Sequence, residues 1–275
     1  MNNSAINNIT AGGYRVTVIV AVYNGAKTLP KCIESIDRQT YQNRELIIMD
    51  GGSTDGTVEI LKNNTQKISF WNSSADRGIY HAFNKALIHA TGDWIYFLGA
   101  DDVLHDEYVF EKFSSIIRNI EKLPLIAYGK IIYCKGQTRK SRGDKWNKVK
   151  DKTKSGMYIP HQGMFHNKNL FEKCGNFDER FKISGDYHLL LRSLRYGEPF
   201  FMSDIIVADQ YAGGKSGDRG SRWRVLQEFR DAQRDVGLRL TSRWTWEFIK
   251  AFIWRCVYAV LRLCHSCLPK KSVHE

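Results

Sequence analysis

Apolar runs that suit buried strands recur through the first half of the chain. Residues 16–22 form a continuous, β-branched apolar run, and residues 45–49, 94–98 and 125–133 repeat the pattern. Such runs are typical of strands buried on both faces of a sheet. Residues 68–71 predict a shorter strand.

Helical patterns lie between these runs. Thr28 as an N-cap and Pro30 in the first turn predict a helix that ends near residue 39, and residues 79–90 predict another. The alternation indicates an α/β fold in which helices cover both faces of a mainly parallel sheet. In such sheets, ligands bind beyond the carboxyl ends of the strands.

The second half is less regular. Residues 135–154 are strongly basic and lack an apolar pattern, which predicts a loop. We expect a short strand over residues 205–208. Helices are expected over residues 187–196, 222–236 and 243–267.

The last of these helices is amphipathic. Trp246, Ile249, Phe252 and Ile253 fall on one side of a helical wheel, opposite basic residues, and Trp244 lies near the polar side. This pattern predicts a helix lying in a membrane interface. The alternative is packing on the preceding α/β domain or on a second subunit.

The chain divides into three expected parts. Residues 1–14 are a disordered lead-in without the features of a signal peptide. Residues 15–220 form the α/β domain, and residues 221–275 form a helical extension. No run of about 20 uncharged apolar residues predicts a transmembrane helix.

Charge narrows the possible partners. The 275 residues carry 41 Lys and Arg against 29 Asp and Glu, a formal net charge of +12. This balance indicates an anionic partner, such as nucleotide phosphates, anionic lipid or nucleic acid. Six scattered cysteines in a chain of this size favour a reducing compartment.

Carboxylates follow two of the expected strands. Asp50 ends one strand, and the adjacent Asp101 and Asp102 follow another. Such a pair can share a hard divalent ion with substrate phosphates. The alternatives are turn chemistry for Asp50 and helix capping for the pair.

Three further residues each have two possible roles. Arg77 can pair with a diphosphate or, as a local surface pair, with Asp76. Asp186 begins a helix, where a carboxylate is either a capping anion or a base. His161 follows Pro160 and is either a structural hydrogen-bonding residue or part of the site.

Seven short motifs occur in order along the chain: VIVAVYN at residues 18–24, DGGSTDGT at 50–57, DRG at 76–78, GDWIYFLGADD at 92–102, PHQG at 160–163, GNFD at 175–178 and SGDY at 184–187. This ordered set resembles the family 2 glycosyltransferases of GT-A fold over residues 15–216, most of all bacterial enzymes of capsule, O-antigen or exopolysaccharide assembly.

The resemblance implies a role for each matching residue. Asp186 would be the general base, Asp101 the ligand of a divalent metal (Mg²⁺ or Mn²⁺), and His161 and Gln162 acceptor or sugar contacts. The donor contacts would be Val22, Tyr23, Asp50, Arg77 and Asp102. Two positions depart from the family pattern. Ala21 replaces a frequent Pro, and Gly99 replaces the first Asp of the D-x-D motif.

The implied activity is an inverting transfer of a sugar from a nucleotide-diphosphate donor, expected to be a UDP-sugar, to a hydroxyl of a glycan or lipid-linked acceptor. The expected location is the cytoplasm, peripheral at the inner face of the plasma membrane, with no nucleic-acid partner. Three alternatives stay open: a nucleotidyltransferase, a basic nucleic-acid-binding protein and a lectin-like binder. A nucleotidyltransferase is disfavoured because residues 23–26 (YNGA) are not a Gly-, Lys- or Arg-rich phosphate loop.

Overall fold

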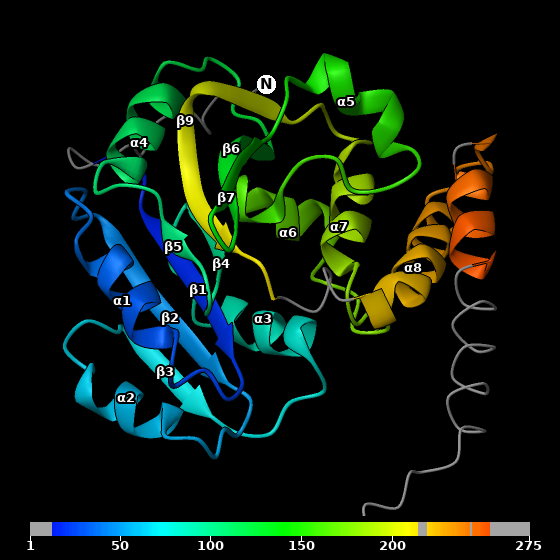
Figure 1. Ribbon diagram of the computed structural model, residues 1–275. Helices are drawn as coiled ribbons and strands as arrows, with labels where there is room; N and C mark the ends of the chain where they lie inside the picture. The colour runs from blue at the N-terminus through cyan, green and yellow to red at the C-terminus, as the bar shows by residue number, and fades with distance from the viewer. Residues whose placement is uncertain (1–12, 214–218, 243, 254–275) are drawn as a thin grey trace, which may run out of the picture.

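A single curled sheet forms the centre of the molecule (Figure 1). The computed structural model describes residues 13–213, 219–242 and 244–253. Within these residues the sheet has nine strands in the order β3-β2-β1-β4-β8-β6-β9-β5, and β7 pairs with β6. The strands are β1 (Val16–Val22), β2 (Arg44–Asp50), β3 (Phe70–Ser73), β4 (Trp94–Gly99), β5 (Val103–Leu104), β6 (Ile126–Lys135), β7 (Thr138–Arg142), β8 (Met164–Asn167) and β9 (Phe200–Tyr211).

The first four strands are parallel, as their apolar runs predict. In the register, Val22 of β1 lies beside Asp50 of β2, and Ala21 lies beside Gly99 of β4. The carboxyl ends of these strands therefore meet at one edge of the sheet. β8 runs antiparallel between β4 and β6, whereas β9 is parallel to β6.

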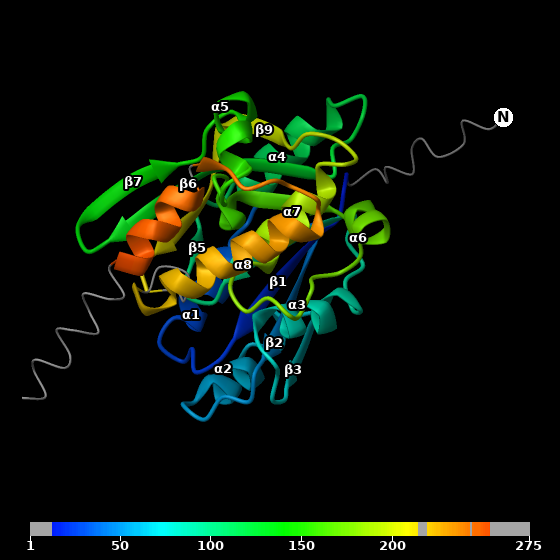
Figure 2. The ribbon, with the colours of Figure 1, turned by 90° about the vertical axis from the view of Figure 1, so that its right-hand side faces the viewer.

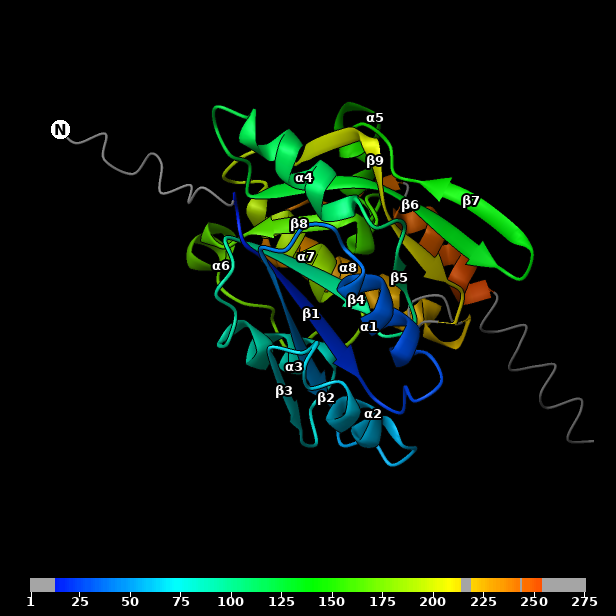
Figure 3. The same ribbon diagram turned by 90° about the vertical axis from the view of Figure 1, so that its left-hand side faces the viewer.

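Helices cover both faces of the sheet, which confirms the expected α/β architecture. They are α1 (Leu29–Asp37), α2 (Thr57–Asn63), α3 (Ile79–Leu87), α4 (Val109–Arg118), α5 (Trp146–Thr153), α6 (Asn169–Cys174), α7 (Gly185–Ser193) and α8 (Arg222–Asp235). Side chains alternate along β1, so Val18 and Val20 pack with α1 and α4 (Figure 3), while Ile19 faces the core that contains α3 and α7 (Figure 2).

The prediction of a loop over residues 135–154 is wrong. β7 and α5 form there, even though every residue of β7 is exposed. Backbone pairing with β6 holds β7 in place, and it needs no apolar pattern. α5 is anchored by Trp146 and Val149, three residues apart and buried, while its lysines face outward.

The C-terminal part packs on the domain. α8 lies along α7 in Figure 2, and residues 244–253 are helical. Trp244, expected near the polar side, is instead buried: its indole N–H donates to the carbonyl of Leu226 at 3.3 Å, and its ring stacks on Phe248. The helical wheel misplaced Trp244 because a wheel drawn for one helix does not show which of its sides packs against α8.

Two of the predicted segments lie partly or wholly outside the residues that the structure describes. These are the lead-in up to residue 12 and the C-terminal helix from residue 254 onward. Among the helices that the structure describes, none has both the length and the apolar character to cross a membrane.

Candidate active site

Asp50 organises the loop that follows β2. Its side chain is 2% exposed, and Oδ2 accepts hydrogen bonds from the amides of Gly52 (3.2 Å) and Ser53 (3.0 Å) and from the Ser73 hydroxyl (2.6 Å). The Ser53 hydroxyl also donates to Oδ1. The structure thus gives Asp50 the turn chemistry that the sequence allowed, at the strand end where the resemblance places the nucleotide base.

The loop after β1 sits against this turn. Asn24 adopts a positive φ of 52°, and its side-chain oxygen accepts the amide of Thr54 at 3.0 Å. Tyr23 is 66% exposed beside Gly51, whereas the Val22 side chain is buried in the core. Of these two expected donor contacts, only Tyr23 presents its side chain to solvent.

Asp101 and Asp102 occupy different environments at the end of β4. Asp101 is exposed. Asp102 is 2% exposed, accepts the amide of Tyr211 at 2.8 Å and takes a hydrogen bond from the Gln162 side chain. Burial, and then the charge of Asp101, raises the pKa of Asp102 to about 7.

Gly99 makes room for this pair. A Cβ at residue 99 would lie 2.6 Å from Oδ2 of Asp102 and 2.9 Å from Oδ1 of Asp101. Both distances are far below van der Waals contact. The two carboxylates therefore fold back over the strand end, into the space that the side chain of the missing first Asp would fill.

The Asp101–Asp102 pair suits a hard divalent cation. Among the described residues, no side chain donates to Asp101, and the two carboxylates repel each other. Mg²⁺ and Mn²⁺ are commonly held by one or two carboxylates together with substrate phosphates. Asp101 would supply the exposed oxygen in such a site.

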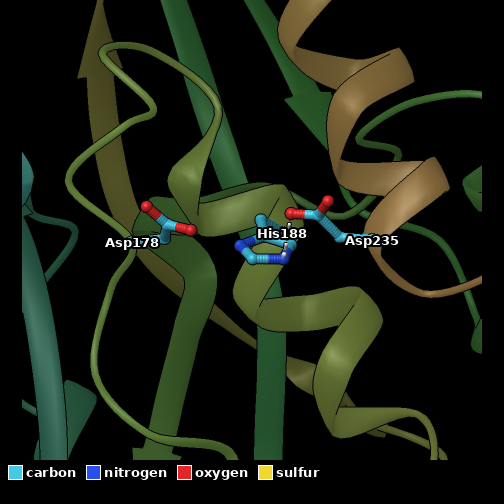
Figure 4. Close-up of side chains that lie close together, drawn as sticks. All are labelled: Asp178, His188 and Asp235. Carbon is cyan, nitrogen blue, oxygen red and sulfur yellow. Dashed lines mark ion pairs between the residues drawn. The ribbon is translucent and has the colours of Figure 1, made fainter.

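A second cluster, Asp178, His188 and Asp235, also brings metal-ligand atoms together (Figure 4). Here the guanidinium of Arg180 already contacts Asp178 at 2.6 Å and Asp235 at 2.8 Å. Arg180 supplies the positive charge that both carboxylates need. We therefore describe Asp178, Arg180 and Asp235 as an ion-pair network that joins the segment before α7 to α8, with the His188 ring beside Asp235.

Asp186 lies in the first turn of α7 and is partly exposed. Its Oδ1 accepts the amide of Tyr187 at 2.8 Å and the hydroxyl of Tyr80 at 3.2 Å, and the same hydroxyl also donates to the carbonyl of Ile183 at 2.7 Å. Burial and the Asp186 charge raise the pKa of Tyr80 well above its usual value, so that its hydroxyl stays protonated. Within the described residues, Oδ2 has no donor and can accept a proton.

His161 and Gln162 link the two acidic positions. The His161 ring stacks on Phe97 of β4 with centroids 5.7 Å apart, and burial lowers its pKa while the nearby Asp186 charge opposes that shift. Gln162, the next residue, contacts Asp102. Both lie in a single 3-10 turn, η1 (His161–Gly163), so one short segment interacts with Asp102 and with Asp186.

Arg77 pairs across the fold rather than locally. Its guanidinium is exposed and lies 2.6 Å from Glu179, while Asp76 accepts the amide of Gly78 at 2.8 Å. The structure thus gives Arg77 a partner that the sequence did not indicate. Tyr80 was also missed, because a tyrosine in an amphipathic helix has the pattern of an ordinary core residue.

Comparisons with known proteins agree with this geometry. The family described as Glycosyl transferase family 2 matches residues 17–181. A PGL/p-HBAD biosynthesis glycosyltransferase of Mycobacterium bovis is 32% identical over 253 residues, covering 88% of this chain and 95% of the relative. An uncharacterised glycosyltransferase of Rickettsia typhi is 26% identical, covering 70% of this chain and 62% of the relative.

Solved structures share the fold. S. aureus TarS 1–349 in complex with UDP-GlcNAc superposes with a TM-score of 0.63 at 16% identity, covering 86% of this chain and 71% of that one. The mannosyltransferase PcManGT from Pyrobaculum calidifontis, in complex with GDP-Man and Mn²⁺, also gives 0.63, at 20% identity, covering 94% and 77%. The matched motifs, the parallel strand ends and these relatives together show that the chain is a glycosyltransferase and belongs to glycosyl transferase family 2.

Proposed function

We propose that this protein is an inverting, metal-dependent glycosyltransferase that moves a sugar from a nucleotide-diphosphate donor, of the UDP-sugar type, to an acceptor hydroxyl. The observation that carries the proposal is that neighbouring residues of one turn interact with both acidic positions: Gln162 hydrogen-bonds to Asp102, and the charge of Asp186 acts on His161. The nucleotide side of the site is the edge formed by β1, β2 and β4, where Asp50 lies.

In this proposal Asp186 is the general base. Oδ2 takes the proton of the acceptor hydroxyl as that oxygen attacks the anomeric carbon, while Tyr80 and the Tyr187 amide hold Oδ1. Attack opposite the leaving diphosphate inverts the anomeric centre. Asp101, with Asp102 beside it, would hold a divalent cation, which would neutralise charge on the departing nucleoside diphosphate.

Other residues would orient the substrates. Tyr23 is exposed at the nucleotide side, where its ring can lie against the base. Arg77 would move from Glu179 to the donor diphosphate, because guanidinium pairs well with phosphate oxygens. His161, neutral at pH 7 because burial lowers its pKa, would contact the sugar or the acceptor together with Gln162.

The class of donor is supported by the fold neighbours that hold UDP-GlcNAc and GDP-Man. An acceptor that is a glycan or is linked to a lipid, in bacterial surface polysaccharide synthesis, is supported by the charge of α5, which presents outward-facing lysines that suit an anionic group.

Membrane attachment from the cytoplasmic side is part of the proposal. Three apolar residues on one side of the helix at 244–253 are exposed: Trp246 (62%), Ile249 (42%) and Ile253 (55%). Phe252 is also exposed (52%), although its ring lies 6.2 Å from that of Trp223 on α8. Trp244 and Phe248, on the other side, already pack against α8. The exposed side is available to enter an interface of anionic lipid, which would place the site beside a lipid-linked acceptor.

Flotation with anionic vesicles tests this attachment. Full-length protein should float with the vesicles. A variant with serine at residues 246, 249, 252 and 253, or a deletion of residues 241–275, should stay in the soluble fraction and retain donor hydrolysis. Equal flotation of the serine variant would show that this face is not the anchor.

The activity itself is tested by nucleoside diphosphate release from a panel of nucleotide sugars, with bacterial membranes as the source of acceptor. We expect release from a UDP-sugar, dependent on the acceptor, and a product with inverted anomeric configuration by NMR. Retained configuration, or no release from any nucleotide sugar, would contradict the proposed reaction.

A further inference from the structure

A buried glutamate on α8 fastens the segment that precedes Asp186. The Glu228 side chain is 10% exposed and accepts three consecutive backbone amides, those of Lys182 (3.0 Å), Ile183 (2.9 Å) and Ser184 (2.8 Å). Bonds from amides to a carboxylate are charge-assisted and stronger than bonds between neutral groups. One side chain thus fixes the backbone immediately before the first turn of α7.

Both carboxylate oxygens are used. Oε2 accepts the amides of Ile183 and Ser184, and Oε1 accepts the amide of Lys182 and lies 3.2 Å from Nε of Arg224. Arg224, one helical turn away and more than half exposed, partly balances the buried charge. All four partners are hydrogen-bond donors, so both carboxylate oxygens act as acceptors.

Further bonds tie α8 to α7 beyond this point. Asp235 contacts Arg180 and lies 3.5 Å from the His188 ring (Figure 4). Gln233 donates to the Tyr187 hydroxyl at 3.3 Å. Among these α8 residues, Glu228 is the one that hydrogen-bonds to the backbone of residues 182–184, a segment that ends two residues before Asp186.

The fastened segment also reaches the donor side of the site. The Lys182 ammonium donates to the carbonyls of Arg77 (3.0 Å) and Glu179 (2.9 Å), and Glu179 holds the Arg77 guanidinium. A shift of residues 182–184 would therefore move Asp186 relative to Tyr80, its hydrogen-bond partner on α3.

We propose that Glu228 is a positioning residue of the transferase reaction: it holds residues 182–184 so that Oδ2 of Asp186 stays aimed at the acceptor hydroxyl. The inference rests on the proposed role of Asp186 as base. It makes α8 a working part of the catalytic domain. Glu228 touches neither substrate and acts through the backbone.

Glu228→Gln tests the role with almost no change in volume. The new amide group must face at least one backbone N–H, donor against donor, so the segment has to shift. A displacement of about 1 Å at a reacting group can cost on the order of a hundredfold in rate. We expect kcat to fall about ten- to a hundredfold while the donor KM and the calorimetric donor Kd stay within about twofold.

The matched control is Asp231→Asn, which removes a carboxylate from the exposed side of the same helix, where Asp231 pairs with Arg234. This variant should keep the wild-type kcat. Hydrogen exchange should separate the variants independently of activity: the amides of residues 182–184 are protected in the wild type and lose protection in Glu228→Gln alone. If Glu228→Gln does not fold, Glu228→Asp, one methylene shorter, replaces it with the same expectations.

Measuring Asp186→Asn in parallel distinguishes a failure of the positioning role of Glu228 from a failure of the assignment of Asp186 as base. If Asp186→Asn is inactive and Glu228→Gln keeps its kcat, the positioning role is overturned and the base assignment stands. If Asp186→Asn turns over normally, the base assignment fails, and the positioning role of Glu228 fails with it. A rise in donor KM equal to the loss in kcat/KM would also overturn the inference, because it would indicate a damaged donor site.

Discussion

The Asp186→Asn variant should show whether Asp186 only caps a helix or acts as a catalytic base. The two roles predict different changes in folding stability and in kcat. In the structure, Oδ1 of Asp186 accepts the Tyr80 hydroxyl and the Tyr187 amide. The oxygen of an asparagine side chain can accept both bonds. The variant should therefore keep the geometry of the first turn of α7.

The expected cost in stability is small. What the variant loses is a negative charge near the N-terminus of a helix, worth about 0.3–1 kcal/mol. For a domain of this size, this corresponds to a fall in Tm of about 1–4 °C. Asparagine and aspartate cap helices about equally well, so no larger loss is expected.

The expected cost in catalysis is much larger. An amide cannot take the proton of the acceptor hydroxyl, and the loss of a general base lowers kcat by about 10²-fold or more. A hundredfold loss corresponds to about 2.7 kcal/mol of transition-state stabilisation, several times the expected change in folding free energy. The two effects are therefore distinguishable in one protein.

The assay combines steady-state nucleoside diphosphate release, donor calorimetry and thermal unfolding on the full-length protein. We expect a large fall in kcat, an unchanged donor Kd and a nearly unchanged Tm, whereas Asp231→Asn should be silent in all three. Near-normal turnover of Asp186→Asn would refute the assignment of the base. A loss of donor binding parallel to the loss of turnover would show that the carboxylate serves the donor instead.

Three other predictions concern particular residues. Asp101→Ala should abolish metal-dependent nucleotide binding in calorimetry and EDTA should reproduce that loss in the wild type; full activity in EDTA would show that basic side chains alone hold the diphosphate. Neutralising Lys148, Lys150, Lys152 and Lys154, on or just after α5, should raise the acceptor KM and leave the donor KM alone, and an unchanged acceptor KM would indicate an ordinary solvated surface. Burial, and then Arg192, lowers the pKa of His188 to about 4, so between pH 6.5 and 4 the unfolded chain binds a proton that the folded chain does not. Thermal stability should therefore fall as the pH drops through this window, and His188→Gln should flatten part of that dependence; an equally steep pH profile in the variant would contradict this account.

Local patterns in the sequence determined the frame of the molecule. The apolar runs at residues 16–22, 45–49 and 94–98 are strands β1, β2 and β4, because a strand buried on both faces leaves an unbroken apolar signature. The strand ends then placed Asp50 and Asp101 at one edge of the sheet. The sequence likewise predicted a helix from residue 187, two residues after the start of α7 at Gly185.

Tertiary contacts decided what these residues do. Gly99 leaves space for two carboxylates, Tyr80 holds Asp186, Glu179 pairs with Arg77, and Trp244 turns inward against α8. The partners of Tyr80 and Arg77 lie 106 and 102 residues away along the chain. Periodicity and spacing carry no information over such distances.

Residues 135–154 show the same limit at the level of secondary structure. β7 forms because β6 offers it a backbone ladder, and α5 forms because two apolar side chains find a core to enter. Neither cause is visible in a basic, mostly polar stretch taken alone. The sequence therefore determined which segments could be buried. Only the tertiary structure decided which polar segments form strands or helices and where their side chains point, because this depends on surfaces contributed from elsewhere in the molecule.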